Sequence, residues 1–275
     1  MIMDSHAHVW SLVRGDYDWL TPDQAALYRD VTIAEVVAKA TACGVEQLIL
    51  VQAAPTVAET AFLLNIADMT PAVAGVVGWI DFAARDLAAL ERVAVNRLLV
   101  GLRPMLQDDS KAAETIARAA DPLLAAMTGH ALVFDALVRA QQLPLVTELA
   151  ARHPTLAIVL DHGGKPRLNG PDLCDWCDDI RALAAHANVS VKLSGLMTEA
   201  LPGSTDRVVA ALRVLLEEFG PGRCLWGSDW PVLGVSGDYE QWYRLVRSVV
   251  EAWGGDATRA VFGDNARRLY RVRRH

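Results

Sequence analysis

The sequence predicts an α/β protein folded as a closed (β/α)8 barrel, and three observations lead to this fold class. Eight short apolar runs rich in β-branched residues alternate with segments whose apolar residues recur at helical spacing. No linker, internal repeat or low-complexity segment interrupts the alternation, so residues 1–275 are expected to form a single domain. No GxGxxG motif follows the first strand, which disfavours a doubly wound open sheet.

The first strand ends in the stretch MDSHAHVW, residues 3–10, which carries His6 and His8. Alternate residues of a strand share a face, so the two imidazoles are expected to leave the strand end side by side. Such a pair suits a divalent metal, or two hydrogen bonds to a developing oxyanion. The alternative is a surface histidine pair without function. Recurrence of polar side chains at the ends of later strands would favour the functional interpretation.

Residues 11–31 are expected to form a long loop, and loops of this length are usually functional. Its aromatic side chains, with Trp10, can wall a pocket or only pack the loop down: Tyr17, Trp19 and Tyr28. Thr32 is expected to cap a helix that Gly44 ends. Thr56 and Glu59 predict a capping box at the start of the helix over 56–69.

The remaining elements repeat the strand and helix alternation. Strands are expected at 47–55, 73–81, 98–106, 131–139, 157–166, 189–196 and 224–231. Helices are expected at 83–96, 111–128, 140–153, 173–186, 205–219 and 239–253, and a last helix over 256–270 closes the chain. The strands are near-continuous apolar runs, which is typical of a parallel sheet covered by helices.

Composition excludes several classes of protein. The net charge of −7 disfavours nucleic acid as a partner, and no apolar run is long enough to cross a membrane. The chain lacks a signal-peptide pattern and is expected to be cytoplasmic. Cys174 and Cys177 form a CxxC, but no second CxxC or histidine pair completes a zinc site, so both are expected to be thiols on one helix face.

Polar side chains close seven of the eight expected strands, where a barrel of this kind places its chemistry. In chain order they are His6, His8, Gln52, Arg103, Asp135, Arg139, His162, Lys165, Lys192, Ser194, Asp229 and Trp230 beside it. Each has a plainer interpretation: Asp229 as a turn residue, His162 as a satisfied turn histidine, the arginines as partners of nearby carboxylates. Their recurrence favours a site, because buried polar groups cost free energy unless they are paired.

Five motifs, DSHAH, DHGGKP, KLSGL, GSDWP and GDNARRLY, resemble the amidohydrolase superfamily, within it the sugar-lactone hydrolases of L-fuconolactonase and L-rhamnonolactonase type. The resemblance runs nearly end to end. It implies that His6, His8, His162 and Asp229 occupy the family's catalytic and metal-binding positions. The chain departs from binuclear members, whose bridging residue on strand 4 and histidine on strand 5 correspond here to the region of Arg103 and to Asp135. The resemblance therefore implies one zinc ion or no metal, and both remain open.

The hypothesis from these residues is hydrolysis of a sugar lactone. Asp229 takes a proton from water, while His6, His8 and His162 stabilise the oxyanion with or without one metal ion. Seven side chains are expected to hold the substrate: Gln52, Arg103, Asp135, Arg139, Lys165, Trp19 and Trp230.

Alternatives from other classes remain. One is a metal-dependent decarboxylase of an unsaturated acid in the same superfamily, and another is amide or phosphoester hydrolysis, which the incomplete binuclear ligand set disfavours. A third is a barrel that binds a sugar acid without chemistry. The expected partner is a small molecule, with a homo-oligomer possible.

Overall fold

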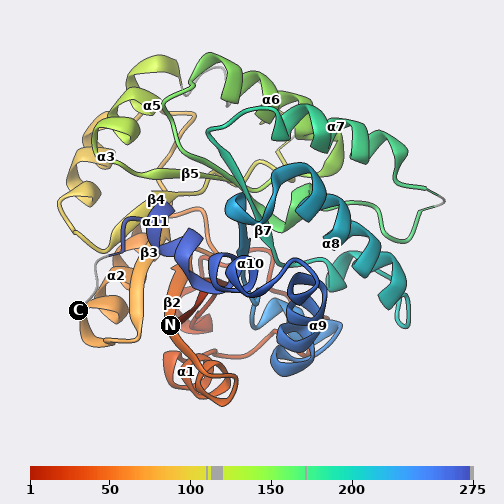
Figure 1. The fold of residues 1–275 in the computed structure, drawn as a ribbon. Coiled ribbons are helices and arrows are strands. Elements are labelled where there is room, and N and C mark those ends of the chain that lie inside the picture. The colour runs from red at the N-terminus through yellow and green to blue at the C-terminus, as the bar shows by residue number, and fades with distance from the viewer. Residues whose placement is uncertain (110, 113–119, 171, 273–275) are drawn as a thin grey trace.

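The computed structural model describes residues 1–109, 111–112, 120–170 and 172–272, and it confirms the barrel. Eight parallel strands lie in the order β1-β2-β3-β4-β5-β6-β7-β8, and helices surround them (Figure 1). The strands are β1 Ile2–Ala7, β2 Val45–Val51, β3 Val73–Gly78, β4 Leu99–Leu102, β5 Val133–Ala136, β6 Ile158–Leu160, β7 Val189–Leu193 and β8 Cys224–Trp226.

The helices follow the predicted order. They are α1 Ile33–Ala42, α2 Val57–Met69, α3 Leu87–Ala94, α5 Ala120–Gly129, α6 Leu143–Arg152, α7 Cys174–Ala184, α8 Thr205–Phe219, α9 Tyr239–Glu251, α10 Gly255–Arg259 and α11 Asn265–Leu269. The helix predicted over 111–128 corresponds in part to α5, and its residues 113–119 lie outside the described residues. The last predicted helix is divided into α10, a π-helical turn at Ala260–Asp264 and α11.

The barrel closes where β1 meets β8, and this junction lies at the strand ends that carry polar residues. Asp229 N donates to His6 O at 2.8 Å, and His8 N donates to Trp230 O at 2.7 Å. These backbone hydrogen bonds alone hold His6 and His8 next to Asp229, independently of side-chain contacts.

Two apolar clusters fill the molecule. The larger lies between the sheet and the surrounding helices. The smaller consists of inward-facing strand residues with Ala266 and Tyr270. Because α11 contacts β1 and β8, it covers the barrel at the end opposite the polar strand ends. In Figure 1 α10 lies near the middle of the ring, and α11 lies beside β4.

The loop over residues 11–31 contains one short 3₁₀ turn at Leu12–Arg14 and is otherwise irregular, as predicted. The Thr56 cap is also present, because its side chain accepts from Glu59 N at 3.0 Å. The predicted capping box is wrong in its second half: the Glu59 carboxylate instead accepts from Ala53 N and from the Tyr17 hydroxyl. Tertiary contacts thus take Glu59 away from its own helix, and they hold the loop against α2.

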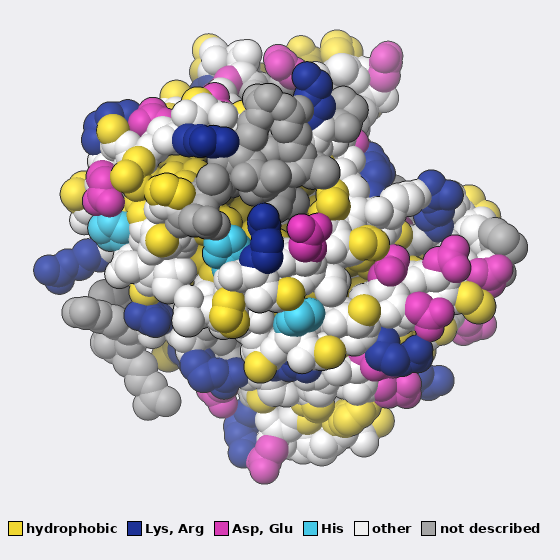
Figure 2. Space-filling model, turned by 90° about the horizontal axis from the view of Figure 1, so that it is seen from above, with side chains coloured by type: hydrophobic (Ala, Val, Ile, Leu, Met, Phe, Trp, Pro, Cys, Tyr) yellow, Lys and Arg dark blue, Asp and Glu magenta, His cyan; other side chains and the backbone are white. Residues whose placement is uncertain are grey.

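Cys174 and Cys177 are free thiols on the first turn of α7, exposed and half-buried respectively. No group of potential metal ligands among the described residues includes them. No helix in the described part of the chain has the length and apolar character needed to cross a membrane. On the face seen in Figure 2, acidic and basic side chains are both spread among apolar ones.

Candidate functional site

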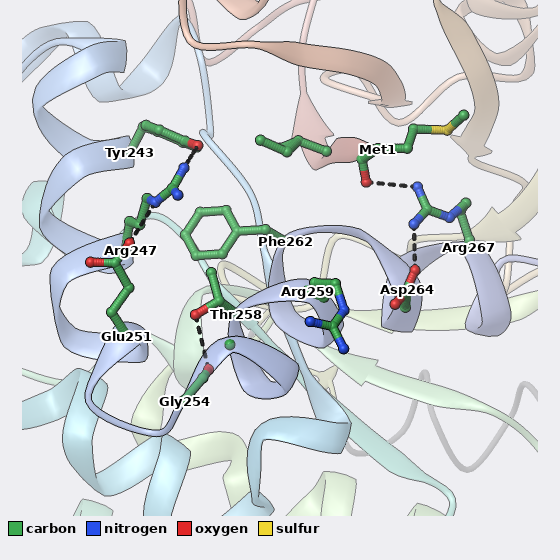
Figure 3. A pocket seen from close by; sticks show the side chains of 12 residues that line it. Met1, Tyr243, Arg247, Glu251, Gly254, Thr258, Arg259, Phe262, Asp264 and Arg267 are labelled. Atoms are coloured by element: carbon green, nitrogen blue, oxygen red, sulfur yellow. Dashed lines mark hydrogen bonds and ion pairs between the residues drawn. The ribbon is translucent and has the colours of Figure 1, made fainter.

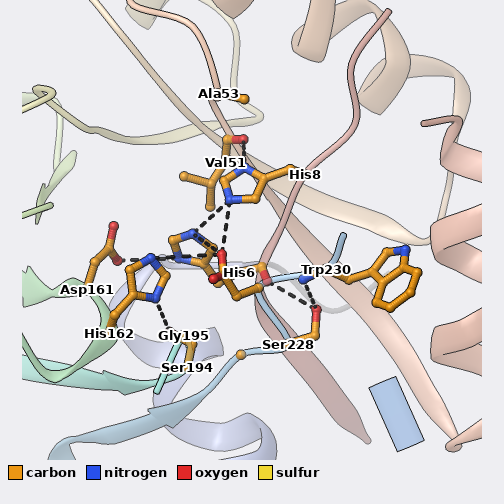
Figure 4. Close-up of polar contacts among 12 residues, drawn as sticks. His6, His8, Val51, Ala53, Asp161, His162, Ser194, Gly195, Ser228 and Trp230 are labelled. Carbon is orange, nitrogen blue, oxygen red and sulfur yellow. Dashed lines mark hydrogen bonds and ion pairs between the residues drawn. The ribbon is translucent and has the colours of Figure 1, made fainter. Parts of the chain in front are cut away.

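His6 and His8 lie side by side at the end of β1, as the alternation predicts. Their Nε2 atoms are 3.2 Å apart, and both side chains are buried. His8 Nδ1 lies 2.7 Å from the carbonyl oxygen of Val51 (Figure 4). A carbonyl only accepts, so His8 Nδ1 carries the proton and its Nε2 presents a lone pair to the cluster.

Asp229 and His162 complete the cluster from the ends of β8 and β6. Asp229 Oδ1 lies 3.3 Å from His8 Nε2, 3.6 Å from His6 Nε2 and 3.9 Å from His162 Nε2. His162 and Asp229 both have left-handed backbone conformations, with φ of 54° and 58°. Such conformations cost free energy in non-glycine residues, and they are concentrated at functional sites.

Three atoms of this cluster fit a single zinc ion. Three tetrahedral ligands at about 2.0–2.2 Å from one zinc would lie about 3.3–3.6 Å from one another. The distances among His6 Nε2, His8 Nε2 and Asp229 Oδ1 are 3.2, 3.3 and 3.6 Å. Two imidazoles and one carboxylate are also ligands that zinc accepts.

The surroundings of Asp229, His6 and His162 favour the protonation states that a metal needs. Burial alone would raise the pKa of Asp229, but His162, His8 and His6 around it hold that pKa below its ordinary value. Burial lowers the pKa of His162 to about 4 and that of His6 well below its ordinary range. Near neutral pH Asp229 is therefore ionised, and His6 and His162 are neutral.

A cavity of about 710 Å³ opens above the cluster. Its walls include seven of the predicted site residues, namely His8, Trp19, Arg103, Arg139, His162, Lys165 and Asp229. His6 lies beneath them, fully buried. Two of the cations in the wall are paired, Arg139 with Asp108 at 2.6 Å and Lys165 with Glu199 at 3.8 Å. The cavity thus combines charged, hydrogen-bonding and apolar surfaces.

Three predicted substrate contacts do not line this cavity. Gln52 is buried, and its side chain donates to Arg103 O at 2.9 Å. Asp135 is fully buried and bonded to Lys192 at 2.5 Å. The Trp230 ring points away from the cluster in Figure 4 and packs on α1, where Lys39 Nζ lies 4.2 Å from its centroid. Gln52 and Asp135 therefore lie beneath the cavity, and Trp230 packs against the outside of the barrel.

Several residues of the site were not singled out from the sequence. Asp161 forms a second group of potential metal ligands with His6 and His162, and its position directly before His162 in DHGGKP was the available signal. Arg103 Nη1 lies 3.3 Å from Asp161 Oδ2, so a cation already faces that carboxylate. Glu199 comes from the loop after β7, where no pattern in the sequence points to it.

A second cavity, of about 390 Å³, lies beside the N-terminus between α9 and α10 (Figure 3). Its arginines face carboxylates of their own helical segments: Arg247 with Glu251, Arg259 with Asp256 and Arg267 with Asp264. No predicted site residue lines this second cavity. The cavity at the strand ends is therefore the candidate active site.

Gly195 makes room for His162, and replacing it should displace that ring. A Cβ at Gly195 would lie 2.5 Å from His162 Nδ1, which the Ser194 hydroxyl also approaches at 2.9 Å. We expect Gly195→Ala to lower kcat about 10²-fold, the effect of moving a positioned group by about 1 Å.

Gly203→Ala is the matched control for this substitution. Both glycines have left-handed φ values, +62° and +84°, but nothing lies within 4 Å of a Cβ at Gly203. Both variants should lose about 1–2 kcal/mol of unfolding free energy in urea, because a Cβ strains this conformation. Equal kcat values for the two variants would contradict the placement of His162.

Comparisons with known proteins show which family the chain resembles over nearly its whole length. A family model described as amidohydrolase matches residues 3–272. The chain is 38% identical to the L-fucono-1,5-lactonase of Burkholderia ambifaria over 278 residues, covering 99% of this chain and 96% of that protein. It is also 38% identical to the L-fucono-1,5-lactonase of Burkholderia multivorans over 283 residues, covering 98% of this chain and 95% of that protein. A crystal structure of an amidohydrolase from Burkholderia multivorans with bound zinc has a TM-score of 0.92 and 36% identity, covering 99% of this chain and 100% of that chain.

Proposed function

This chain belongs to the amidohydrolase family, and from that membership we propose that it is an enzyme that hydrolyses the ring ester of a sugar lactone. The substrate to test first is L-fucono-1,5-lactone, because relatives named for that activity match this chain over nearly its whole length. One observation carries the proposal: His6, His8, His162 and Asp229 converge at the base of a cavity of about 710 Å³.

The two oxygens of Asp229 would have different tasks. Oδ1 faces the histidines and would hold one zinc ion together with His6 and His8. When bound, the ion would supply a Lewis acid that polarises the lactone carbonyl. The contacts of Asp229 with the three histidines all run through Oδ1, and Oδ2 would accept a proton from the attacking water.

The remaining steps need only the residues of the site. Water attacks the ring carbonyl as Asp229 removes its proton, and a tetrahedral oxyanion forms. His162 would support it through Nε2–H, the tautomer in which Nδ1 accepts from the Ser194 hydroxyl at 2.9 Å. The ring C–O bond then breaks, and Asp229 returns the proton to the departing alkoxide. An alkoxide leaves more readily than an amine, so a lactone is a suitable substrate for these catalytic groups.

The walls of the cavity suit a polyhydroxylated ring. The Arg103 guanidinium lies 3.4 Å from His6 Nε2, and the Arg139–Asp108 and Lys165–Glu199 pairs offer donors and acceptors for hydroxyl groups. Trp19 presents a flat apolar surface to the cavity, while its Nε1 donates to Ala53 O at 2.7 Å. A sugar ring has both kinds of surface.

Trp19→Ala should therefore weaken binding of the lactone more than it slows chemistry. We expect KM to rise about tenfold with kcat within about twofold, because a wall contact holds substrate and transition state alike. Tyr28→Ala is the control, since Tyr28 belongs to the same loop but is 42% exposed and does not line the cavity. Steady-state kinetics on one lactone measure both values for each variant. A fall in kcat at constant KM for Trp19→Ala would contradict the assignment of Trp19 as a substrate contact.

A panel of aldonolactones, followed with a pH indicator, tests the proposed function. Both 1,4 and 1,5 rings should be included, and turnover of at least one above the spontaneous rate is expected. Release of carbon dioxide from an unsaturated acid would favour the decarboxylase alternative. Calorimetric binding of a sugar acid without turnover of any lactone would favour a non-catalytic binding barrel.

A further inference from the structure

A layer of buried charged side chains fills the barrel directly beneath the cavity. Lys192 of β7, Asp135 of β5 and Asp161 after β6 are all fully buried. The smaller apolar cluster, which includes Tyr270, fills the barrel beside this layer, and the Tyr270 ring faces Lys192. Burying charges costs free energy unless each is paired in good geometry. The proposed reaction uses none of these groups directly, so their presence needs another explanation.

Lys192 is the centre of the layer. Its Nζ lies 2.5 Å from Asp135 Oδ2, 3.0 Å from Asp161 Oδ1 and 3.1 Å from His6 Nδ1. The ammonium group lies within ion-pair distance of both carboxylates, and its third neighbour is the Nδ1 edge of the His6 ring. Zinc binding through Nε2 requires the proton of neutral His6 to be on Nδ1, and Asp161 Oδ1 faces Nδ1 from below at 3.4 Å. Nε2 then faces His8 and Asp229 above. The His6 ring cannot turn without losing one of these contacts.

The C-terminal segment holds Lys192 in turn. Tyr270, the residue after α11, donates its hydroxyl to Asp135 Oδ2 at 2.8 Å. Its ring centroid lies 5.6 Å from Lys192 Nζ, within range of a cation–π contact. The same carboxylate oxygen of Asp135 therefore accepts from Lys192 and from Tyr270. A continuous line of contacts runs from the seal at the far end of the barrel to His6.

We propose that Lys192 is a positioning residue for His6 through Asp161, and that Tyr270, acting through Asp135, sets the position of Lys192 for metal binding by His6. The proposal rests on the metal-binding role of His6 given above. It makes Tyr270 part of the active-site architecture, although Tyr270 does not line the cavity. Outer contacts that orient a metal-binding histidine typically affect metal affinity by about 10–100-fold.

Tyr270→Phe tests this, because it removes one hydroxyl and leaves every charge in place. The metal-free protein is titrated with zinc in competition with a chromophoric chelator, and kcat and KM are measured on L-fucono-1,5-lactone. We expect zinc affinity to fall about tenfold and kcat to fall with KM within about twofold. Tyr243→Phe is the control: its hydroxyl accepts from Arg247 at 2.6 Å on α9, outside the barrel, and both values should stay at the wild-type level.

Urea unfolding of the same variants separates positioning from simple stability. Wild-type zinc affinity in Tyr270→Phe overturns the proposal, even when its unfolding free energy is lower. Absence of zinc binding by the wild type also overturns it. The zinc titration does not depend on turnover: reduced affinity in Tyr270→Phe supports the proposal even when no lactone is hydrolysed. If the wild type hydrolyses the lactone and Tyr270→Phe has unchanged zinc affinity, the positioning proposal is rejected and the proposed function stands.

Discussion

Asp229→Asn is expected to reduce kcat by about 10³-fold or more, while the lactone still binds with a KM within a few-fold of the wild type. An amide at this position cannot accept a proton from water, and general base catalysis is worth about 10²–10⁴-fold. The size and shape of the side chain are retained, so the left-handed turn and its backbone bond to His6 should persist.

Glu199→Gln is the control for the loss of a carboxylate in the same cavity. Glu199 lines the wall and pairs with Lys165, but it lies outside the histidine cluster. The Glu199→Gln variant should have a higher KM for the lactone and nearly the wild-type kcat. An Asp229→Asn variant that keeps its kcat and loses only affinity for the lactone would show that Asp229 binds substrate and is not the base.

Removing the metal is expected to have the second large effect. Exhaustive chelation should lower kcat at least about 10²-fold, and zinc should restore it, because the ion held by His6, His8 and Asp229 would polarise the carbonyl under attack. His8→Ala should weaken zinc binding by at least about 10²-fold, since losing a ligand costs more than the 10–100-fold typical of its outer partners. The orientation of His8 by the Val51 carbonyl makes its Nε2 a ready ligand.

His130→Ala serves as the control for His8→Ala. His130 pairs with Glu91 at 3.0 Å on the surface and belongs to neither group of potential ligands. Metal content by elemental analysis and kcat are measured for both variants. Full activity of a chelated protein in which no metal is detected would contradict the metal-dependent account, and it would assign carbonyl polarisation to the histidines themselves.

The fold was predictable from the sequence because each βα unit is locally encoded. The β-rich runs are buried on both faces, and signals such as the Thr32 and Thr56 caps mark helix starts that the structure confirms. The boundaries were less exact: the third strand ends at Gly78, while the prediction continued to Asp81. Apolar composition extends past the last ladder bond, so a pattern alone places a strand end within a few residues.

The meeting of His6, His8, His162 and Asp229 was foreseeable from their positions at strand ends. The level at which each inward side chain lies inside the barrel was not. Asp135 lies under the pocket, and the partnership of Lys192 with Tyr270 joins residues far apart in sequence. Such levels depend on strand tilt and stagger around the closed barrel, which composition and periodicity do not specify. Trp230 points outward because the backbone turns at Asp229.

A single turnover in water enriched in oxygen-18, with enzyme in excess over L-fucono-1,5-lactone, tests the central claim most directly. The claim is that Asp229 activates water, which itself attacks the ring carbonyl. The account predicts one heavy oxygen in the carboxylate of the released acid and none in Asp229 by mass spectrometry of its peptide. A product without the label, with oxygen-18 in Asp229, would show that the carboxylate attacks as a nucleophile and would contradict the account.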